Sequence, residues 1–246
     1  MSRHTAGGNL KSKRSDSAFF VVSTAAILVF VFAGFARTFY LHRLFGLPAP
    51  SAFMSFHGLL MSGWILLLFI QTGLVARRRV LWHRRLGIAG ACYAAAIVVV
   101  GCAATLIAAT REVRANSANV ASQFNVLALE LTQMLLFASL VGAGVWLRRR
   151  YEWHKRLMLL ATLCILPNVI VRISLLSTND FFQRNINLLS VWALLVLAVV
   201  ALDSYRRRRV HPAFGLVAPL TVSCLYAAYF VGLSTPWIRF AGWLVS

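Results

Sequence analysis

The chain alternates long apolar runs with short polar segments. Seven runs are each long enough to cross a bilayer, whose apolar core of about 30 Å needs about 20 helical residues. Continuous apolarity over such lengths excludes single buried strands, and it differs from the short alternating segments of an outer-membrane barrel. We therefore expect helices at residues 18–36, 52–76, 86–109, 124–147, 157–176, 186–202 and 214–233.

This pattern predicts an all-α, polytopic membrane bundle of seven transmembrane helices, with residues 18–246 as a single domain. Residues 1–17 are basic and contain Gly and Ser, so we expect a disordered cytoplasmic tail there. The first apolar run with its basic flank also resembles a secretory signal peptide, but its length favours a helix that is retained.

The charge is strongly asymmetric, with 25 Lys and Arg against 6 Asp and Glu. In a soluble chain this excess would suggest nucleic acid. Here the basic residues cluster between apolar runs, so we expect no nucleic-acid partner. Eighteen of them lie in the tail and after the second, fourth and sixth helices, which places these segments in the cytoplasm. The N-terminus is then cytoplasmic and the C-terminus outside, and the basic face is expected to bind anionic lipids.

Two of the cytoplasmic turns share a sequence pattern. Residues 77–86 read RRRVLWHRRL and residues 148–157 read RRRYEWHKRL, so the arginines, Trp, His and Leu recur 71 residues apart. We infer that helices 2–3 and 4–5 are parallel repeats of one hairpin, related by an axis along the membrane normal.

The repeat gives His83 and His154 equivalent positions at the starts of helices 3 and 5. Two such imidazoles could ligate a haem iron from opposite faces, with the flanking arginines neutralising its propionates. His211, at the head of helix 7, could join a metal site on the same membrane face. The alternative is that all three histidines are interfacial residues that contact lipid phosphates or helix ends.

A second group of polar residues lies within the apolar runs. At about 1.5 Å per residue, Glu130 is about 27 Å and Arg172 about 24 Å from the cytoplasmic arginines, so we expect them to pair. His57 reaches about 30 Å, and Gln133 and Asn168 lie somewhat deeper. These five residues form a predicted outer polar layer. It could be a ligand or proton site open to the outside, or a structural ion pair with interhelical hydrogen bonds.

Several motifs carry a resemblance to known proteins: HGLLMSGWILLLFIQTGLV at 57–75, HRRLG at 83–87 and EWHKRLMLLAT at 152–162. The chain resembles, over roughly residues 35–220, bacterial multi-pass inner-membrane families of unknown function with HRxxG and HKRLM hairpin motifs. This resemblance implies a bacterial inner (plasma) membrane location. The chain is loosely similar to the cytochrome b561 type of helical core, which holds two b haems on paired intramembrane histidines. Only His57 lies well within a span here, so a single haem b at the cytoplasmic side is the form that remains open.

No catalytic motif of the GxSxG, HExxH or Walker type occurs in the sequence. We therefore expect an accessory subunit of a membrane complex, or one that binds a ligand or cofactor, rather than an enzyme. The alternatives are a haem- or quinone-linked redox protein and a small-molecule transporter that uses the outer polar layer.

Overall fold

The computed structural model describes residues 3–115, 120–174 and 187–245. Within these ranges the chain is helical and has no strand. Seven helical segments are long and apolar enough to cross a membrane: Asp16–Tyr40, Ala52–Ala76, Val80–Arg114, Val120–Trp146, Tyr151–Ser174, Leu188–Arg207 and Pro212–Gly232. The all-α fold with seven candidate spans is thus confirmed. The predicted ends at residues 176 and 186 lie outside the described residues.

The described elements follow one another in this order. They are α1 (Arg3–Phe35), a π-helical turn η1 (Ala36–Tyr40), a 3-10 turn η2 (His42–Phe45), α2 (Ala52–Ala76), α3 (Val80–Arg114), α4 (Val120–Trp146), α5 (Tyr151–Cys164), α6 (Pro167–Ser174), α8 (Leu188–Arg207), α9 (Pro212–Gly215), α10 (Val217–Gly232) and α11 (Thr235–Val245). Helix α1 includes most of the segment predicted as a tail, and its membrane-compatible part begins at Asp16.

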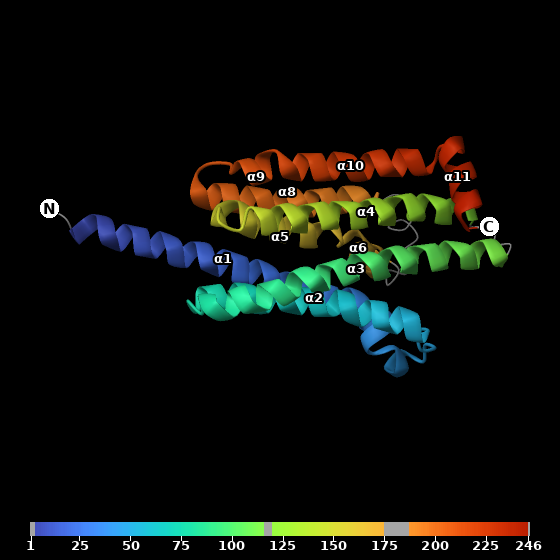
Figure 1. The fold of residues 1–246 in the computed structure, drawn as a ribbon, viewed down its shortest axis with the longest axis horizontal. Coiled ribbons are helices and arrows are strands. Elements are labelled where there is room, and N and C mark those ends of the chain that lie inside the picture. The colour runs from blue at the N-terminus through green and yellow to red at the C-terminus, as the bar shows by residue number, and fades with distance from the viewer. Residues whose placement is uncertain (1–2, 116–119, 175–186, 246) are drawn as a thin grey trace.

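The helices run roughly parallel or antiparallel along the long axis of the molecule, with α2 and α3 on one side and α8 and α10 on the other (Figure 1). Helix α4 packs against α3, α5 and α10 and so joins the two sides. The segment formed by α5 and α6 is the most enclosed: 67% of its most apolar window is buried, against at most 39% for any other candidate span. It therefore forms the centre of the bundle.

Helix α5 ends where Pro167 removes a hydrogen-bond donor. Proline has no N–H to donate to the carbonyl four residues earlier, which is that of Leu163. The Leu163 carbonyl accepts instead from the Trp192 indole Nε1 of α8 at 2.7 Å, and from the backbone N–H of Leu166 at 3.1 Å. Trp192 is fully buried, so this bond fixes α8 against the break between α5 and α6.

All three arginine-rich turns, after α2, α4 and α8, lie at one end of the bundle, and α1 extends beyond the other helices there (Figure 1). At the other end α11 crosses the bundle axis, and the Trp237 indole donates to the Phe124 carbonyl of α4 at 2.7 Å. One end thus gathers the basic turns, and we refer to it as the basic end.

Candidate functional site

His83 and His154 lie close together at the basic end. Their ring centroids are 6.1 Å apart and the ring planes are nearly perpendicular, at 79°. Each histidine begins its helix in the same way, because the backbone N–H of His83 donates to Arg79 and that of His154 to Arg150, both at 3.1 Å. The two repeats therefore share the hydrogen bond that starts each helix, and their imidazoles lie together. The turns themselves differ, because Arg78 has a left-handed backbone with φ 58° and its counterpart Arg149 does not.

Each imidazole is held by the preceding helix of its own hairpin. His154 Nδ1 hydrogen bonds the Gly144 carbonyl of α4 at 2.8 Å. The Nδ1–H must be the donor, so the neutral ring keeps its lone pair on Nε2. The His83 ring lies next to the backbone of Gln71 on α2. A Cβ on Gly144 would lie 2.6 Å from the Met158 Cε and 3.5 Å from the Leu157 Cβ, so the glycine leaves space for α5 at this contact.

Two buried polar atoms of these residues have no hydrogen-bond partner among the described residues, namely His83 Nδ1 and Gln71 Oε1. Buried polar atoms are nearly always paired, so orphaned ones are a signal for water or a ligand. The sequence analysis did not name Gln71 as a site residue. The available signal was a polar residue in the last two turns of an apolar helix, shortly before the first repeated turn.

His211 occupies a different place at the same end of the molecule. Its Nδ1 accepts a hydrogen bond from the Ala213 N–H at 3.1 Å and caps α9, and its ring packs edge-on against Trp153 at 5.5 Å. Burial lowers the pKa of His211 below its ordinary value of 6.5, as do the charges of Arg156 and Arg207. Within the described part of the chain, no three His, Cys, Asp or Glu side chains group as a metal site.

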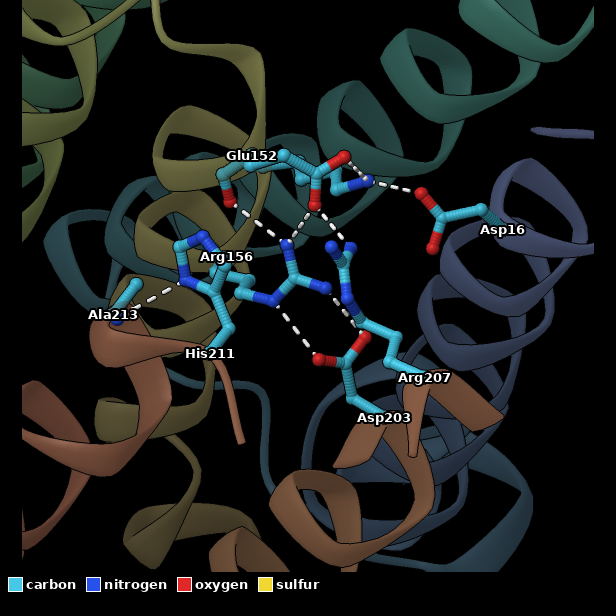
Figure 2. A network of polar contacts seen from close by, with 8 residues as sticks. Asp16, Glu152, Arg156, Asp203, Arg207, His211 and Ala213 are labelled. Atoms are coloured by element: carbon cyan, nitrogen blue, oxygen red, sulfur yellow. Dashed lines mark hydrogen bonds and ion pairs between the residues drawn. The ribbon is translucent and has the colours of Figure 1, made fainter. Parts of the chain in front are cut away.

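A network of ion pairs lies beside His211 (Figure 2). Arg156 of α5 is completely buried and forms a two-pronged pair with Asp203 of α8, from Nε at 2.9 Å and from Nη2 at 2.8 Å. Its Nη1 donates to the Glu152 carboxylate at 2.5 Å and to the Glu152 carbonyl at 2.9 Å. Glu152 also pairs with Lys155 and Arg207, and Lys155 pairs with Asp16 of α1. The network joins α1, α5 and α8.

This network was not predicted from the sequence. Arg156 counted there as one basic residue of a cytoplasmic turn, and neither Glu152 nor Asp203 was singled out. Two signals were present: the Glu152–Arg156 spacing of four residues, which favours a helical ion pair, and an acidic residue near the end of an otherwise apolar helix.

The predicted outer polar layer lies toward the other end of the bundle. Glu130 interacts electrostatically with Arg172 and is close to the Thr105 hydroxyl of α3. No salt bridge joins Glu130 and Arg172 in the part of the chain that the structure describes, and the Arg172 guanidinium lies 5.9 Å from the Phe35 ring centre. The two charges are thus neighbours without a direct ion pair.

His57 lies at the same level as these groups. Helices α2 and α3 contact each other at Met61 and Gly101, because the Met61 methyl is 3.5 Å from where a Cβ on Gly101 would be. His57 lies one turn from Met61 on α2, and Thr105 lies one turn from Gly101 on α3, both in the same direction along the bundle. Gln133 is buried on α4 and Asn168 lies in the first turn of α6. His57 Nδ1 and Gln133 Oε1 are buried without a partner among the described residues.

Comparisons with protein-family models, with curated proteins and with solved structures gave no match to this chain.

Proposed function

We propose that this multi-pass membrane protein is a cofactor-carrying subunit of a membrane redox complex, in which His83 and His154 hold one metal centre. The observation that carries the proposal is their 6.1 Å ring separation beside an orphaned His83 Nδ1. Two imidazoles on opposite sides of one metal have ring centres roughly 6–6.5 Å apart, because each nitrogen–metal bond is about 2.0–2.1 Å and each ring centre lies about 1.1 Å beyond its nitrogen.

Haem b is the centre that this donor set fits best. A protein-bound zinc ion needs at least three protein ligands, whereas haem iron needs only its two axial positions filled. The residues around the pair would serve the cofactor in ordinary ways. The Gly144 carbonyl orients the His154 ring through Nδ1, and arginines of the two turns would neutralise propionates. When bound, haem would supply one-electron transfer at the membrane surface.

The location and the partners belong to the same proposal. The excess of basic residues at one end of the bundle supports a bacterial plasma membrane with the basic end in the cytoplasm. The small loops support docking to a larger membrane complex, because they leave no space for a soluble catalytic domain. The resemblance to the HRxxG and HKRLM families fits this location.

The test is the haem and metal content per chain of protein purified in mild detergent from haem-supplied cells. We expect one haem in the wild type, less than a tenth of that in His83→Ala and His154→Ala, and partial recovery when imidazole is added to either variant. His42→Ala is the matched control, because His42 Nδ1 bonds the Phe39 carbonyl far from the pair. Full haem content in both site variants, or none in the wild type, would refute the proposal.

A second candidate function is ligand or proton binding in the outer polar layer, which the orphaned His57 Nδ1 and Gln133 Oε1 favour. If this function is correct, we expect Glu130→Gln to abolish the response to ligand while the protein still accumulates. If Glu130→Gln fails to accumulate and the additional change Arg172→Gln restores it, the two charges are structural.

A further inference from the structure

A long apolar groove runs between α8 and α10 on the side of the bundle away from α2. It encloses about 510 Å³. Its walls are formed by Ala193, Leu197 and Val200 of α8 and by Ala218 and Val222 of α10. Leu194 and Leu197 remain 64% and 60% exposed, so the packing of the chain itself leaves this face uncovered.

The two ends of the groove differ. At the end away from the basic turns, the Ser190 hydroxyl and the Tyr226 hydroxyl hydrogen bond at 2.7 Å and close it. At the basic end the groove reaches Phe214 and Gly215, just beyond the α8–α9 turn. The ten steps along α8 from Ser190 to Val200 span about 15 Å, which equals half of a hydrocarbon core of about 30 Å. The groove therefore has the length of one leaflet.

The turn at the open end of the groove is strongly basic. Arg208 and Arg209 follow α8 directly and are exposed, and Arg208 has a left-handed backbone with φ 53°. The turn leads directly into α9, whose Phe214 and Gly215 line the groove. The basic turn and the apolar groove thus follow each other as the phosphate and an acyl chain do in a phospholipid.

We propose that this groove binds one anionic phospholipid of the cytoplasmic leaflet, with its phosphate at Arg208 and Arg209 and one acyl chain between α8 and α10. The site rests on the chain residing in a membrane and is independent of the histidine pair, so either proposal can fail alone.

The test is native mass spectrometry of the full chain after exchange into mild detergent with phosphatidylglycerol or phosphatidylcholine. We expect the wild type to retain one phosphatidylglycerol and to discriminate against phosphatidylcholine. Arg208→Gln with Arg209→Gln should weaken retention by about thirtyfold, since it removes two cations from an anion site. The matched control is Arg148→Gln with Arg149→Gln, which removes the same charge from another basic turn.

The acyl slot is tested separately. Ala193→Phe fills the groove from α8 and should abolish retention, while Ala198→Phe, an exposed position of the same helix outside the groove, should not. If Ala193→Phe does not accumulate, Val222→Phe closes the groove from α10. Equal retention of both lipids, equal loss in the two arginine pairs, or retention that survives a filled groove would overturn the proposal, as would capture of a neutral quinone in place of the phospholipid.

Discussion

At the scale of single residues, the basic end of the molecule depends on the guanidinium of Arg156. The group is removed from water completely, which costs several kcal/mol unless the charge is compensated. Asp203 offers both carboxylate oxygens to it, and Glu152 adds a carboxylate and a carbonyl oxygen. Phe20 and Phe214 lie near it, with ring centres 5.8 Å and 5.5 Å from Cζ. The charge is therefore well paired in an otherwise apolar setting.

Removing only one partner should be worse than removing both. Asp203→Leu leaves Arg156 buried without its two-pronged partner and should lower the free energy of unfolding by about 3–5 kcal/mol. The double change Asp203→Leu with Arg156→Leu should recover much of that loss. Thermal unfolding in detergent measures both, and a double variant no more stable than Asp203→Leu would contradict this view of the network.

His211 should make stability depend on pH. Its folded pKa lies below 6.5, so the folded state resists protonation. The stabilising contribution is fully present above pH 6.5 and is lost as the pH falls through the lowered pKa. Arg156 and Arg207 disfavour the imidazolium, while Glu152 and Asp203 favour it. We expect the Tm of the wild type to fall more between pH 7.5 and pH 5 than the Tm of His211→Asn, whose amide oxygen can still cap α9. Parallel pH profiles would show that another group is responsible.

At the scale of elements, small residues set how closely the helices approach. A Cβ on Gly232 of α10 would lie 3.0 Å from the Asn125 Cα and 3.1 Å from the Ala128 Cβ of α4. The Asn125 amide also donates to the Tyr229 carbonyl at 2.7 Å. Small residues at helix contacts are typical of membrane bundles, where packing and hydrogen bonds drive association. This contact fixes α10, which forms one wall of the proposed lipid groove.

Gly232→Val should force α4 and α10 apart and cost about 1–3 kcal/mol of unfolding free energy. Gly142→Ala on α4 is the control, because a Cβ there meets nothing within 4 Å. It should be neutral or stabilising by up to about 1 kcal/mol. Thermal unfolding of the two variants compares them directly, and equal effects would contradict the role of the close approach.

The helices were largely predictable, because a long apolar run in hydrocarbon must satisfy its backbone hydrogen bonds within the segment, which a helix does. The expected helix at 52–76 coincides with α2, and the other described spans differ at their ends by up to a turn or two. The break at Pro167 and the Arg156–Asp203 pair were not predicted. Both depend on which helices touch, and apolarity alone does not specify the neighbours of a helix in a bilayer.

The candidate site was predictable to a similar extent. The repeat at 77–86 and 148–157 gave the pair His83 and His154, because each histidine starts the next helix with the same hydrogen bond to the third arginine of its turn. It gave neither Gln71 nor the role of Gly144, since both contacts run between helices. His211 was predicted as a possible metal ligand only because it lies on the same membrane face as the histidine pair. In the structure its ring packs against Trp153.

At the scale of the whole molecule, the three arginine-rich turns gather at one end and α11 crosses the other (Figure 1). We expect the basic end to face the cytoplasm. In a variant whose four cysteines are replaced by alanine, a new cysteine at Arg149 should be protected from a membrane-impermeant maleimide in intact cells, and one at Arg239 should be labelled. The reverse pattern would show the opposite orientation.

The absorption spectrum of the purified wild-type protein, oxidised and then reduced with dithionite, tests the central claim most directly. A metal centre held by the His83 and His154 imidazoles should give visible haem bands that change on reduction, at one haem per chain. A spectrum with only the aromatic band, from protein made with adequate haem and free of bound metal, would contradict the claim and move the search for function to the Glu130 layer.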